Sequence, residues 1–298
     1  MPIRQDVAMG TLVTIQIVGS GSEDSAHAAL DRAFGWFHEI EARCSRFSER
    51  SELMQLTAQP GVAVPASAIL YEAVQFALMV AEATGGAFDP TIGHRMHAHG
   101  FNREHRTGEI VRNLCTPDDD ASYRDVQLDS DRRTIALRRP LTLDLGAVAK
   151  GLAVDMAARE LHAFQDFAID AGGDLYLGGS NERSAPWSVG IRHPRNEDEL
   201  IACLRISNQA VCTSGDYERR APGDRSHHIL DPHTGASAGA VASATVVAAG
   251  AMLADALATA VFVLGPAEGI QLLNRMGVDG LIVTPELERF ETRGLCHA

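Results

Sequence analysis

Two oxygen-bearing side chains stand four residues apart in an otherwise apolar stretch of the sequence. Asp255 and Thr259 lie between Ala248 and Leu264, where nearly all other residues are apolar. In a helix, positions i and i+4 share one face, so both oxygens could reach a single ion. A carboxylate in such surroundings must be paired, hydrogen-bonded or bound to metal. Hard oxygen ligands without a nearby cysteine or histidine favour Mg²⁺ over zinc, although Asp255 could instead cap a neighbouring helix.

The chain has 26 basic residues, and a single one of them, Lys150, is a lysine. It closes the segment Asp144-Leu-Gly-Ala-Val-Ala-Lys150 and is followed by Gly151. A compact ammonium can act as a point charge on a phosphate or a carboxylate, whereas a guanidinium is broad and planar. Asp144 is a natural N-cap for the predicted helix, and free backbone groups in an uncluttered first turn can face a cation or a phosphate. Chance retention of a lysine on a helix surface is the alternative.

The segment Gly85-Gly-Ala-Phe-Asp-Pro-Thr-Ile-Gly93 could approach a ligand closely. Its two leading glycines permit close backbone approach, Phe88 offers a flat apolar face, and Asp89 precedes a proline in extended backbone. The same glycines could equally form a helix C-cap followed by a turn.

Two adjacent histidines precede the turn at 231–235. The stretch is predicted as the end of a strand that enters this turn, with Pro232 at position i+1. Because neighbours on a strand alternate between faces, either His227 or His228 should point along the buried face. A histidine held there beside a ligand is a plausible general acid or base. The histidines at 94, 97, 99 and 105 are expected to be solvated loop residues rather than metal ligands.

The composition sets limits on the class of protein. Apolar residues make up 45% of the 298 residues and charged residues 22%, which is typical of a soluble globular protein. The net charge of −13 argues against a nucleic-acid partner or an anionic membrane surface, and no membrane span is expected. Five separated cysteines without a CxxC pair indicate a reduced, cytosolic protein. With no leader segment at the start of the sequence, a cytoplasmic location is expected, or a periplasmic one if a leader had been removed.

The elements that must position these residues alternate irregularly. Apolar periodicity predicts helices at 22–43, 65–83, 146–164, 250–264 and 267–276. Residues of strand type occur at 11–18, 125–129, 134–138, 141–145, 166–170, 174–178, 187–191, 201–206, 242–249, 280–284 and 288–292. Residues 94–120 are predicted to be irregular and exposed, and 214–226 to form a loop. Without a clean βαβ repeat, α+β is favoured over a doubly wound sheet, and without a separating linker residues 1–298 are expected to form a single domain.

Taken together, these segments resemble the FAD:protein FMN transferase family, the ApbE-type flavin transferases. The resemblance implies an α+β fold of two interleaved α/β subdomains, with mostly antiparallel sheets and an FAD cleft between them. It rests on motifs that follow one another over almost the whole chain: Met9-Gly10-Thr11, Ser45-Arg46-Phe47 with Ser51-Glu52-Leu53, GGAFDPTIG, DLGAVAKG with Asp155, Ala171-Gly172-Gly173-Asp174, TSGDYER, HHILDPHTG and ADALATA.

The resemblance also implies a reaction. FMN is moved from FAD onto a Thr or Ser hydroxyl of a partner flavoprotein through a phosphoester bond, with Mg²⁺ as cofactor and release of AMP. An FAD pyrophosphatase, in which water replaces the acceptor hydroxyl, would use the same groups. A non-catalytic FAD-binding protein is a further alternative, against which intact Asp255, Thr259 and His228 weigh. The sequence has no GxxxxGK[ST] loop to support an unrelated nucleotide hydrolase.

Site residues follow from the resemblance, position by position. His228 matches the histidine proposed as the catalytic base. Asp255, Thr259 and the backbone carbonyl of Ala147 match the Mg²⁺ ligands. The positions that match FAD-binding residues are Met9, Phe47, Ala87, Phe88, Asp89, Asp144, Lys150 and Ile229. The chain departs from the family pattern at 94–109, which lacks an expected tryptophan and is rich in histidine.

Overall fold

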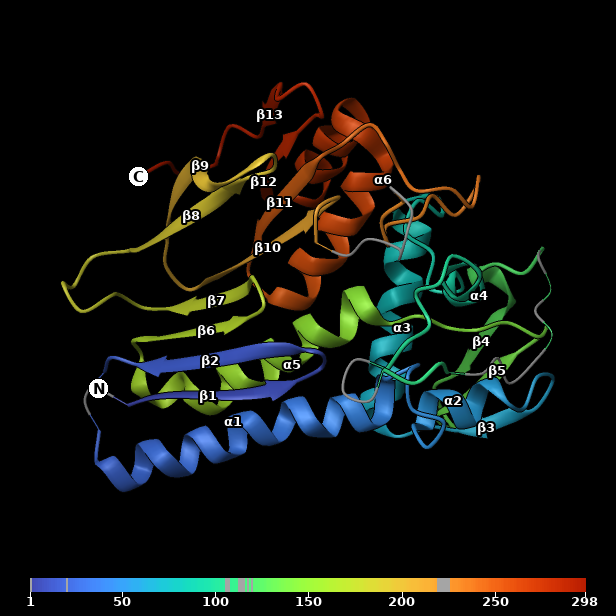
Figure 1. Cartoon of the computed structure of the whole chain (residues 1–298). Coiled ribbons are helices and arrows are strands. Elements are labelled where there is room, and N and C mark those ends of the chain that lie inside the picture. The colour runs from blue at the N-terminus through green and yellow to red at the C-terminus, as the bar shows by residue number, and fades with distance from the viewer. Residues whose placement is uncertain are drawn as a thin grey trace. The chain divides into compact units, whose positions relative to one another are not determined.

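The computed structural model of the chain describes residues 2–19, 21–104, 108–111, 116, 118, 120–218 and 226–298. The chain divides into two compact units, each assembled from segments far apart in the sequence (Figure 1). The first unit takes in Met1–His38, Lys150–Glu218 and Gly239–Ala298, and the second Glu39–Ala149 and Arg219–Ala238. Every pairing between the named strands is antiparallel. The predicted α+β fold with interleaved subdomains and mostly antiparallel sheets is confirmed.

The first unit is built on an eight-stranded sheet in the order β1-β2-β6-β7-β10-β11-β12-β13. In β2, Val13, Ile15 and Ile17 are buried and alternate with more exposed neighbours, as expected for a strand that buries one face. All six residues of β11 are buried, because both faces of the sheet are covered there. The strands are β1 (Ile3–Ala8), β2 (Thr11–Ile17), β6 (Phe167–Ala171), β7 (Asp174–Gly178), β10 (Gln209–Gly215), β11 (Ser243–Ala248), β12 (Asp279–Val283) and β13 (Arg289–Glu291).

Two layers cover the central strands of this sheet. The helix α6 (Ala251–Met276) packs against β10, β11 and β12. A two-stranded sheet of β8 (Trp187–His193) and β9 (Asn196–Ile206) covers the other face, and Figure 1 shows both layers. Its residue Leu204 joins Val247 of β11 in one apolar cluster. The helices α1 (Glu23–Cys44) and α5 (Gly146–Leu161) each contain a boundary between the segments of the two units.

The helix α6 is long and apolar enough to cross a membrane by its length and composition, which the sequence analysis did not anticipate. More than half of that stretch is buried inside the structure. The helix is bent at Gly265, with φ 80° and ψ 176°, directly before Pro266. The break that the sequence predicted between helices at 250–264 and 267–276 is confirmed, because Gly265 is non-helical and separates two helical stretches within α6. Because α6 packs on the sheet, it is a core helix. A core helix can be as long and as apolar as a helix that crosses a membrane.

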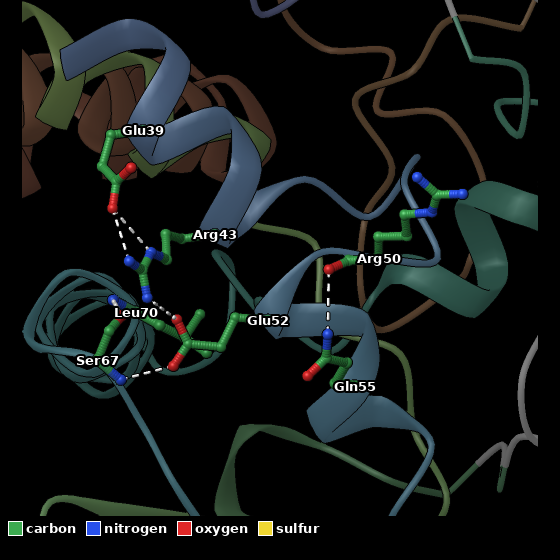
Figure 2. A network of polar contacts seen from close by, with 7 residues as sticks. All are labelled: Glu39, Arg43, Arg50, Glu52, Gln55, Ser67 and Leu70. Atoms are coloured by element: carbon green, nitrogen blue, oxygen red, sulfur yellow. Dashed lines mark hydrogen bonds and ion pairs between the residues drawn. The ribbon is translucent and has the colours of Figure 1, made fainter. Parts of the chain in front are cut away.

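The second unit combines short helices with a three-stranded sheet in the order β3-β5-β4. Ser51 and Ser67 accept hydrogen bonds at the starts of α2 and α3 as N-caps. Figure 2 shows how ion pairs connect these starts: Arg43 binds Glu39 and Glu52, and Glu52 also accepts a hydrogen bond from the backbone N of Ser67 at 2.5 Å. The elements are α2 (Glu52–Thr57), α3 (Ala68–Ala83), α4 (Gly93–Ala98), β3 (Ala63–Pro65), β4 (Val126–Asp129) and β5 (Thr134–Leu137).

Three predictions about local structure were wrong: those for residues 141–145, for residues 94–120, and for the strand that was to carry His227 and His228. Residues 141–145 form no strand, although Leu141, Leu143 and Leu145 are all buried. Their backbone instead bonds to a loop, since the backbone N of Gly93 donates to the carbonyl of Thr142 at 3.1 Å. The apolar alternation therefore reflected burial and not a sheet ladder.

The second wrong prediction concerns residues 94–120, which were expected to be irregular and exposed. They begin in the short helix α4, where His94 and Met96 are buried. The histidine at 105 and most of the loop predicted at 214–226 lie outside the described residues. Elements that the sequence did not predict are β1, β3, β10, α2 and α4.

Candidate functional site

In the second unit, Asp144 fixes the start of α5. One carboxylate oxygen, Oδ1, accepts a hydrogen bond from the backbone N of Gly146 at 2.7 Å. The other, Oδ2, forms an ion pair with Arg46 that the sequence did not predict. Ala147 departs from helical geometry, with φ −91° and ψ 15°, so its carbonyl does not point as in a regular helix. The predicted capping role of Asp144 is confirmed, and the first turn of α5 is irregular at the residue predicted to bind metal.

Arg46 also contacts two aromatic residues of this unit. Its guanidinium lies 4.1 Å from the ring centroid of Phe47, a cation–π contact. Its Nη2 donates a hydrogen bond to the backbone carbonyl of Phe101 at 2.6 Å. Arg46 itself is only 7% exposed. Phe47, one of the predicted FAD-binding residues, is half-buried under this arginine.

The segment after α3 shows the C-cap that was the alternative to a ligand loop. Gly85 and Gly86 both have positive φ, and the backbone N of Gly86 donates to the carbonyl of Ala81 at 2.9 Å, as in a helix-ending Schellman motif. Ala87 and Phe88 are each 5% exposed, so the Phe88 ring is largely buried within this unit. The helix C-cap therefore explains both glycines without a ligand.

Asp89 fastens this segment to a neighbouring loop. Its Oδ1 accepts hydrogen bonds from the backbone N and the hydroxyl of Thr91, at 2.8 and 2.7 Å, and its Oδ2 accepts one from the backbone N of Tyr123 at 3.2 Å. A pocket of about 230 Å³ opens beside it, with Arg95, Arg124 and His233 also in its wall. Of the FAD-binding residues predicted in this unit, all of them described, Asp89 alone borders the pocket.

The two adjacent histidines occupy different environments, but not on a strand as predicted. His227 is buried, and its Nε2 lies 2.8 Å from the carbonyl of Ala238. The backbone N of Ile229 donates to the Nδ1 of His227 at 3.3 Å. This pair of contacts requires a proton on Nε2 and none on Nδ1, so both ring nitrogens are occupied. The buried histidine is thus His227, a structural residue, and Ile229 is buried beside it.

His228 is the half-buried member of the pair. Its ring meets the ring of Phe101 edge-on, with centroids 6.3 Å apart. Edge-to-face contacts of this kind favour one orientation of the ring. The residue predicted as the base, His228, is therefore the more exposed histidine of the two, and the buried one is His227.

In the first unit, the single lysine has a carboxylate partner. Lys150 forms an ion pair with Asp174, the first residue of β7, whose side chain is 3% exposed against 20% for the lysine. A carboxylate this deeply buried is strongly destabilising without a cation. Of the two partners proposed for the ammonium, phosphate and carboxylate, the structure contains the carboxylate. The Gly-Gly-Asp motif drew attention to Asp174 in the sequence, but its ion pair with Lys150 was not predicted.

Gly151 and Asp155 serve the packing of α5 on α6. A Cβ on Gly151 would lie 2.5 Å from the carbonyl oxygen of Ala251, so glycine is needed for this close approach rather than for a ligand. Asp155 accepts hydrogen bonds from the backbone N of Ala251 at 2.6 Å and of Met252 at 3.0 Å. Burial raises the pKa of Asp155, against the opposing effect of these hydrogen bonds. Asp155 thus has the helix-capping role that had been considered for Asp255.

Asp255 and Thr259 lie one turn apart on α6, and the carboxylate is buried at 7% exposure. The Thr259 hydroxyl lies 3.3 Å from the Ser214 hydroxyl at the end of β10. Burial and the charge of Asp255 raise the pKa of Cys212 well above its usual value. Within the described part of the chain, no three His, Cys, Asp or Glu side chains gather as a metal site. Carboxylate and hydroxyl oxygens are nevertheless a donor set that suits Mg²⁺.

Met9 is the remaining predicted residue of the first unit. With Gly10 it forms the two-residue turn between β1 and β2, where Ala8 pairs with Thr11. Both turn residues have positive φ, 52° for Met9 and 76° for Gly10. This backbone suits a hairpin, but a non-glycine residue rarely adopts it, and such strain is often found at functional sites.

In the first unit, the buried Asp255 lies one turn from Thr259, and Lys150 pairs with the buried Asp174. In the second unit, Phe101 contacts a half-buried histidine, His228. Carboxylates, cations and histidines are groups that enzymes use in phosphoryl transfer. Comparison with known proteins makes this specific. The model of the ApbE family matches residues 9–282, and the chain belongs to this family. The resemblance inferred from the motifs is confirmed.

Curated relatives and solved structures agree with this assignment. The chain is 34% identical to an FAD:protein FMN transferase of Treponema pallidum, over 95% of this chain and 84% of that protein. It is 28% identical to the FAD:protein FMN transferase of Escherichia coli K12, over 97% and 86%. The ApbE protein of Thermotoga maritima superposes with a TM-score of 0.86 at 30% identity, covering 98% of this chain and 97% of that one. The flavin transferase ApbE of Vibrio cholerae gives 0.82 at 25% identity, over 98% and 97%.

Proposed function

We propose that this protein is an FAD:protein FMN transferase. It moves FMN from FAD onto a Thr or Ser hydroxyl of a partner flavoprotein and releases AMP. The observation that carries the proposal is membership of the ApbE family over residues 9–282, together with curated relatives of that activity that align with almost the whole chain. The acceptor is a flavoprotein whose identity the chain does not encode.

The reaction requires a nucleophile, a leaving group and a proton acceptor. The acceptor hydroxyl oxygen attacks the FMN-side phosphorus of FAD, the bond from that phosphorus to the bridging oxygen breaks, and AMP leaves with the electron pair. His228 takes the proton of the hydroxyl as general base. His227 is unsuited to this role because its Nδ1 accepts from Ile229 and its Nε2 contacts the Ala238 carbonyl.

Positive charge at the pyrophosphate is the second requirement. In the first unit, Asp255 and Thr259 would hold Mg²⁺, which would supply charge neutralisation at the pyrophosphate oxygens. The support for this is the buried carboxylate and the hydroxyl one turn later on α6. Lys150 adds a second positive charge. An ammonium has three donors, so Lys150 can remain paired with Asp174 and still donate to a phosphate oxygen.

The remaining proposed residues bind FAD. In the first unit this is Met9, held in a strained hairpin turn. In the second unit, Asp144 is fixed at the start of α5 by two contacts. The others of the second unit are Phe47, Ala87, Phe88, Asp89 and Ile229.

Co-expression with candidate flavoproteins tests the proposal. The intact mass of the true acceptor should increase by one covalently attached FMN, and the increase should disappear when its Thr or Ser is replaced by Ala. If FAD is instead split to FMN and AMP with no mass change in any acceptor, the protein is an FAD pyrophosphatase. If FAD binds but is not split, it is a flavin-binding protein.

A further inference from the structure

We propose that Arg46 is a positioning residue for flavin transfer, a buried guanidinium that holds two of the second unit's proposed FAD-binding residues, Asp144 and Phe47, and through Phe101 its proposed base in place. The inference rests on the proposed function and adds to it a residue that no resemblance assigned a role. Three contacts of Arg46, each to a different segment of the unit, carry it.

The first contact runs through Asp144 to the start of α5. Arg46 pairs with Oδ2 of this carboxylate, which leaves Oδ1 directed at the backbone N of Gly146, 2.7 Å away. The next residue, Ala147, is the one whose backbone leaves helical geometry. Substitution of Arg46 removes the guanidinium that pairs with Oδ2, next to the Oδ1 hydrogen bond that defines this irregular turn.

The second contact is with Phe47. The guanidinium carbon lies 4.1 Å from the ring centroid, within the distance of a strong cation–π contact. Because Arg46 is 7% exposed, this contact is largely shielded from water. The ring is therefore held in one orientation by the adjacent residue in the sequence.

The third contact reaches the proposed base through Phe101. Nη2 of Arg46 donates to the Phe101 carbonyl at 2.6 Å, and the backbone N of Phe101 donates to the carbonyl of Met96 at 3.0 Å. With its backbone held on both sides, Phe101 presents its ring edge-on to His228 at 6.3 Å between centroids. Arg46 thus acts on His228 through one intermediate side chain.

Only an arginine can make all three contacts. They require two donors from different nitrogens and a flat face for the ring at the same time, which the planar guanidinium provides. A lysine keeps the charge but has neither the fork nor the face. Substitution by lysine therefore removes the geometry while it conserves the charge.

Arg43 supplies a matched control. It lies three residues earlier, also makes ion pairs, and contacts Glu39 and Glu52 in the network of Figure 2. Its side chain is 39% exposed, and neither glutamate is a proposed site residue. Replacing Arg43 by lysine changes an arginine ion pair in the same unit without touching the proposed site.

The experiment compares Arg46→Lys with Arg43→Lys in the full chain. FAD affinity is measured by flavin fluorescence, FMN transfer by the intact mass of the acceptor, and folding by melting temperature. We expect Arg46→Lys to melt within about 4 °C of the wild type, to bind FAD roughly 10-fold or more weakly, and to lose about 10²-fold in turnover, as misplacement of about 1 Å can cause. Arg43→Lys should change neither FAD affinity nor turnover by more than about 3-fold.

Wild-type FAD affinity and turnover in Arg46→Lys would overturn the proposal, as would an equal loss in both arginine variants. If Arg46→Lys does not fold, Arg46→Gln is measured in the same way, with the same expected losses. If neither folds while Asp144→Asn does, Arg46 is a core residue and the proposal is wrong. Failure of the wild type to transfer FMN would count against the proposed function instead, since the FAD affinities of the two variants can be compared without any acceptor.

Discussion

The two units hold their proposed site residues in different ways. In the first unit the proposed charged residues have local partners: Lys150 pairs with the buried Asp174, and the buried Asp255 lies one turn from Thr259 on α6. In the second unit one residue, Arg46, connects several segments. Under the proposed assignment, the first unit would supply charge, whereas the second would orient groups and accept a proton. Substitutions in the first unit should therefore alter the dependence on cations, and those in the second the rate at a given FAD occupancy.

The largest effect is expected at His228, in the second unit. His228→Ala should retain FAD affinity but lower FMN transfer by about 10²–10⁴-fold, the usual contribution of a positioned proton acceptor. Fluorescence titration and the intact mass of the acceptor would measure the two quantities separately.

His227→Ala is the matched control for that prediction. It should reduce the free energy of unfolding by about 1–3 kcal/mol, because it leaves the Ala238 carbonyl and the Ile229 N–H without their ring partner. Transfer by the folded fraction should change far less than in His228→Ala. If His227→Ala abolishes transfer and His228→Ala does not, the two histidines have been assigned in the wrong order.

The next largest effect should appear at Asp255, in the first unit. Asp255→Asn weakens the proposed Mg²⁺ site and should lower transfer by roughly 10²-fold, which corresponds to a few kcal/mol of lost charge stabilisation. High Mg²⁺ or Mn²⁺ should restore part of the rate, whereas it should not restore that of His228→Ala. Full wild-type activity in EDTA would contradict the assignment of a metal to this unit.

A smaller effect is expected for Lys150. Lys150→Arg should be nearly as damaging as Lys150→Ala, with an FAD affinity about 10-fold weaker than that of the wild type. The reason is that a guanidinium differs in size and donor geometry from the ammonium that pairs with Asp174. Calorimetry with FAD would measure the loss. An arginine variant with wild-type affinity would mean that charge alone suffices at this position.

The smallest effect concerns stability and pH. Burial raises the folded-state pKa of the Asp155 carboxyl above its usual value. A raised carboxyl pKa contributes stability below the unfolded-state pKa, and this contribution is lost as the pH rises through the folded-state pKa. In denaturant titrations at several pH values, the free energy of unfolding of Asp155→Asn should therefore fall less than that of the wild type as the pH rises through the folded-state pKa of Asp155. An identical pH dependence in both proteins would show that Asp155 does not contribute.

Part of the fold and of the candidate site could be predicted from the sequence, because it depends on patterns among neighbouring residues. The alternation in β2 and the oxygen pair on α6 are properties of neighbouring residues, and both were predicted. Contacts between distant segments were not: Arg46 and Asp144 are 98 residues apart, and no periodicity connects them. The rarity of lysine drew attention to Lys150, whereas Arg46 was one of many arginines.

The wrong predictions have a common physical cause. An apolar alternation at 141–145 was interpreted as a strand, although buried loops produce the same pattern when their side chains pack and their backbone bonds elsewhere. For the histidine pair, a strand was assumed, and from it we inferred that His227 and His228 point to opposite faces. The environments of His227 and His228 do differ, but through side-chain hydrogen bonds that the sequence does not encode locally.

The stoichiometry of products with a purified acceptor tests the central claim most directly. The protein, FAD, Mg²⁺ and the acceptor identified by co-expression are incubated together, and AMP is quantified alongside the covalent FMN on the acceptor. Transfer predicts one AMP released for each FMN attached, and no FAD cleavage when the acceptor hydroxyl is removed by substitution with Ala. Equal amounts of free FMN and AMP, with the acceptor mass unchanged, would contradict the account.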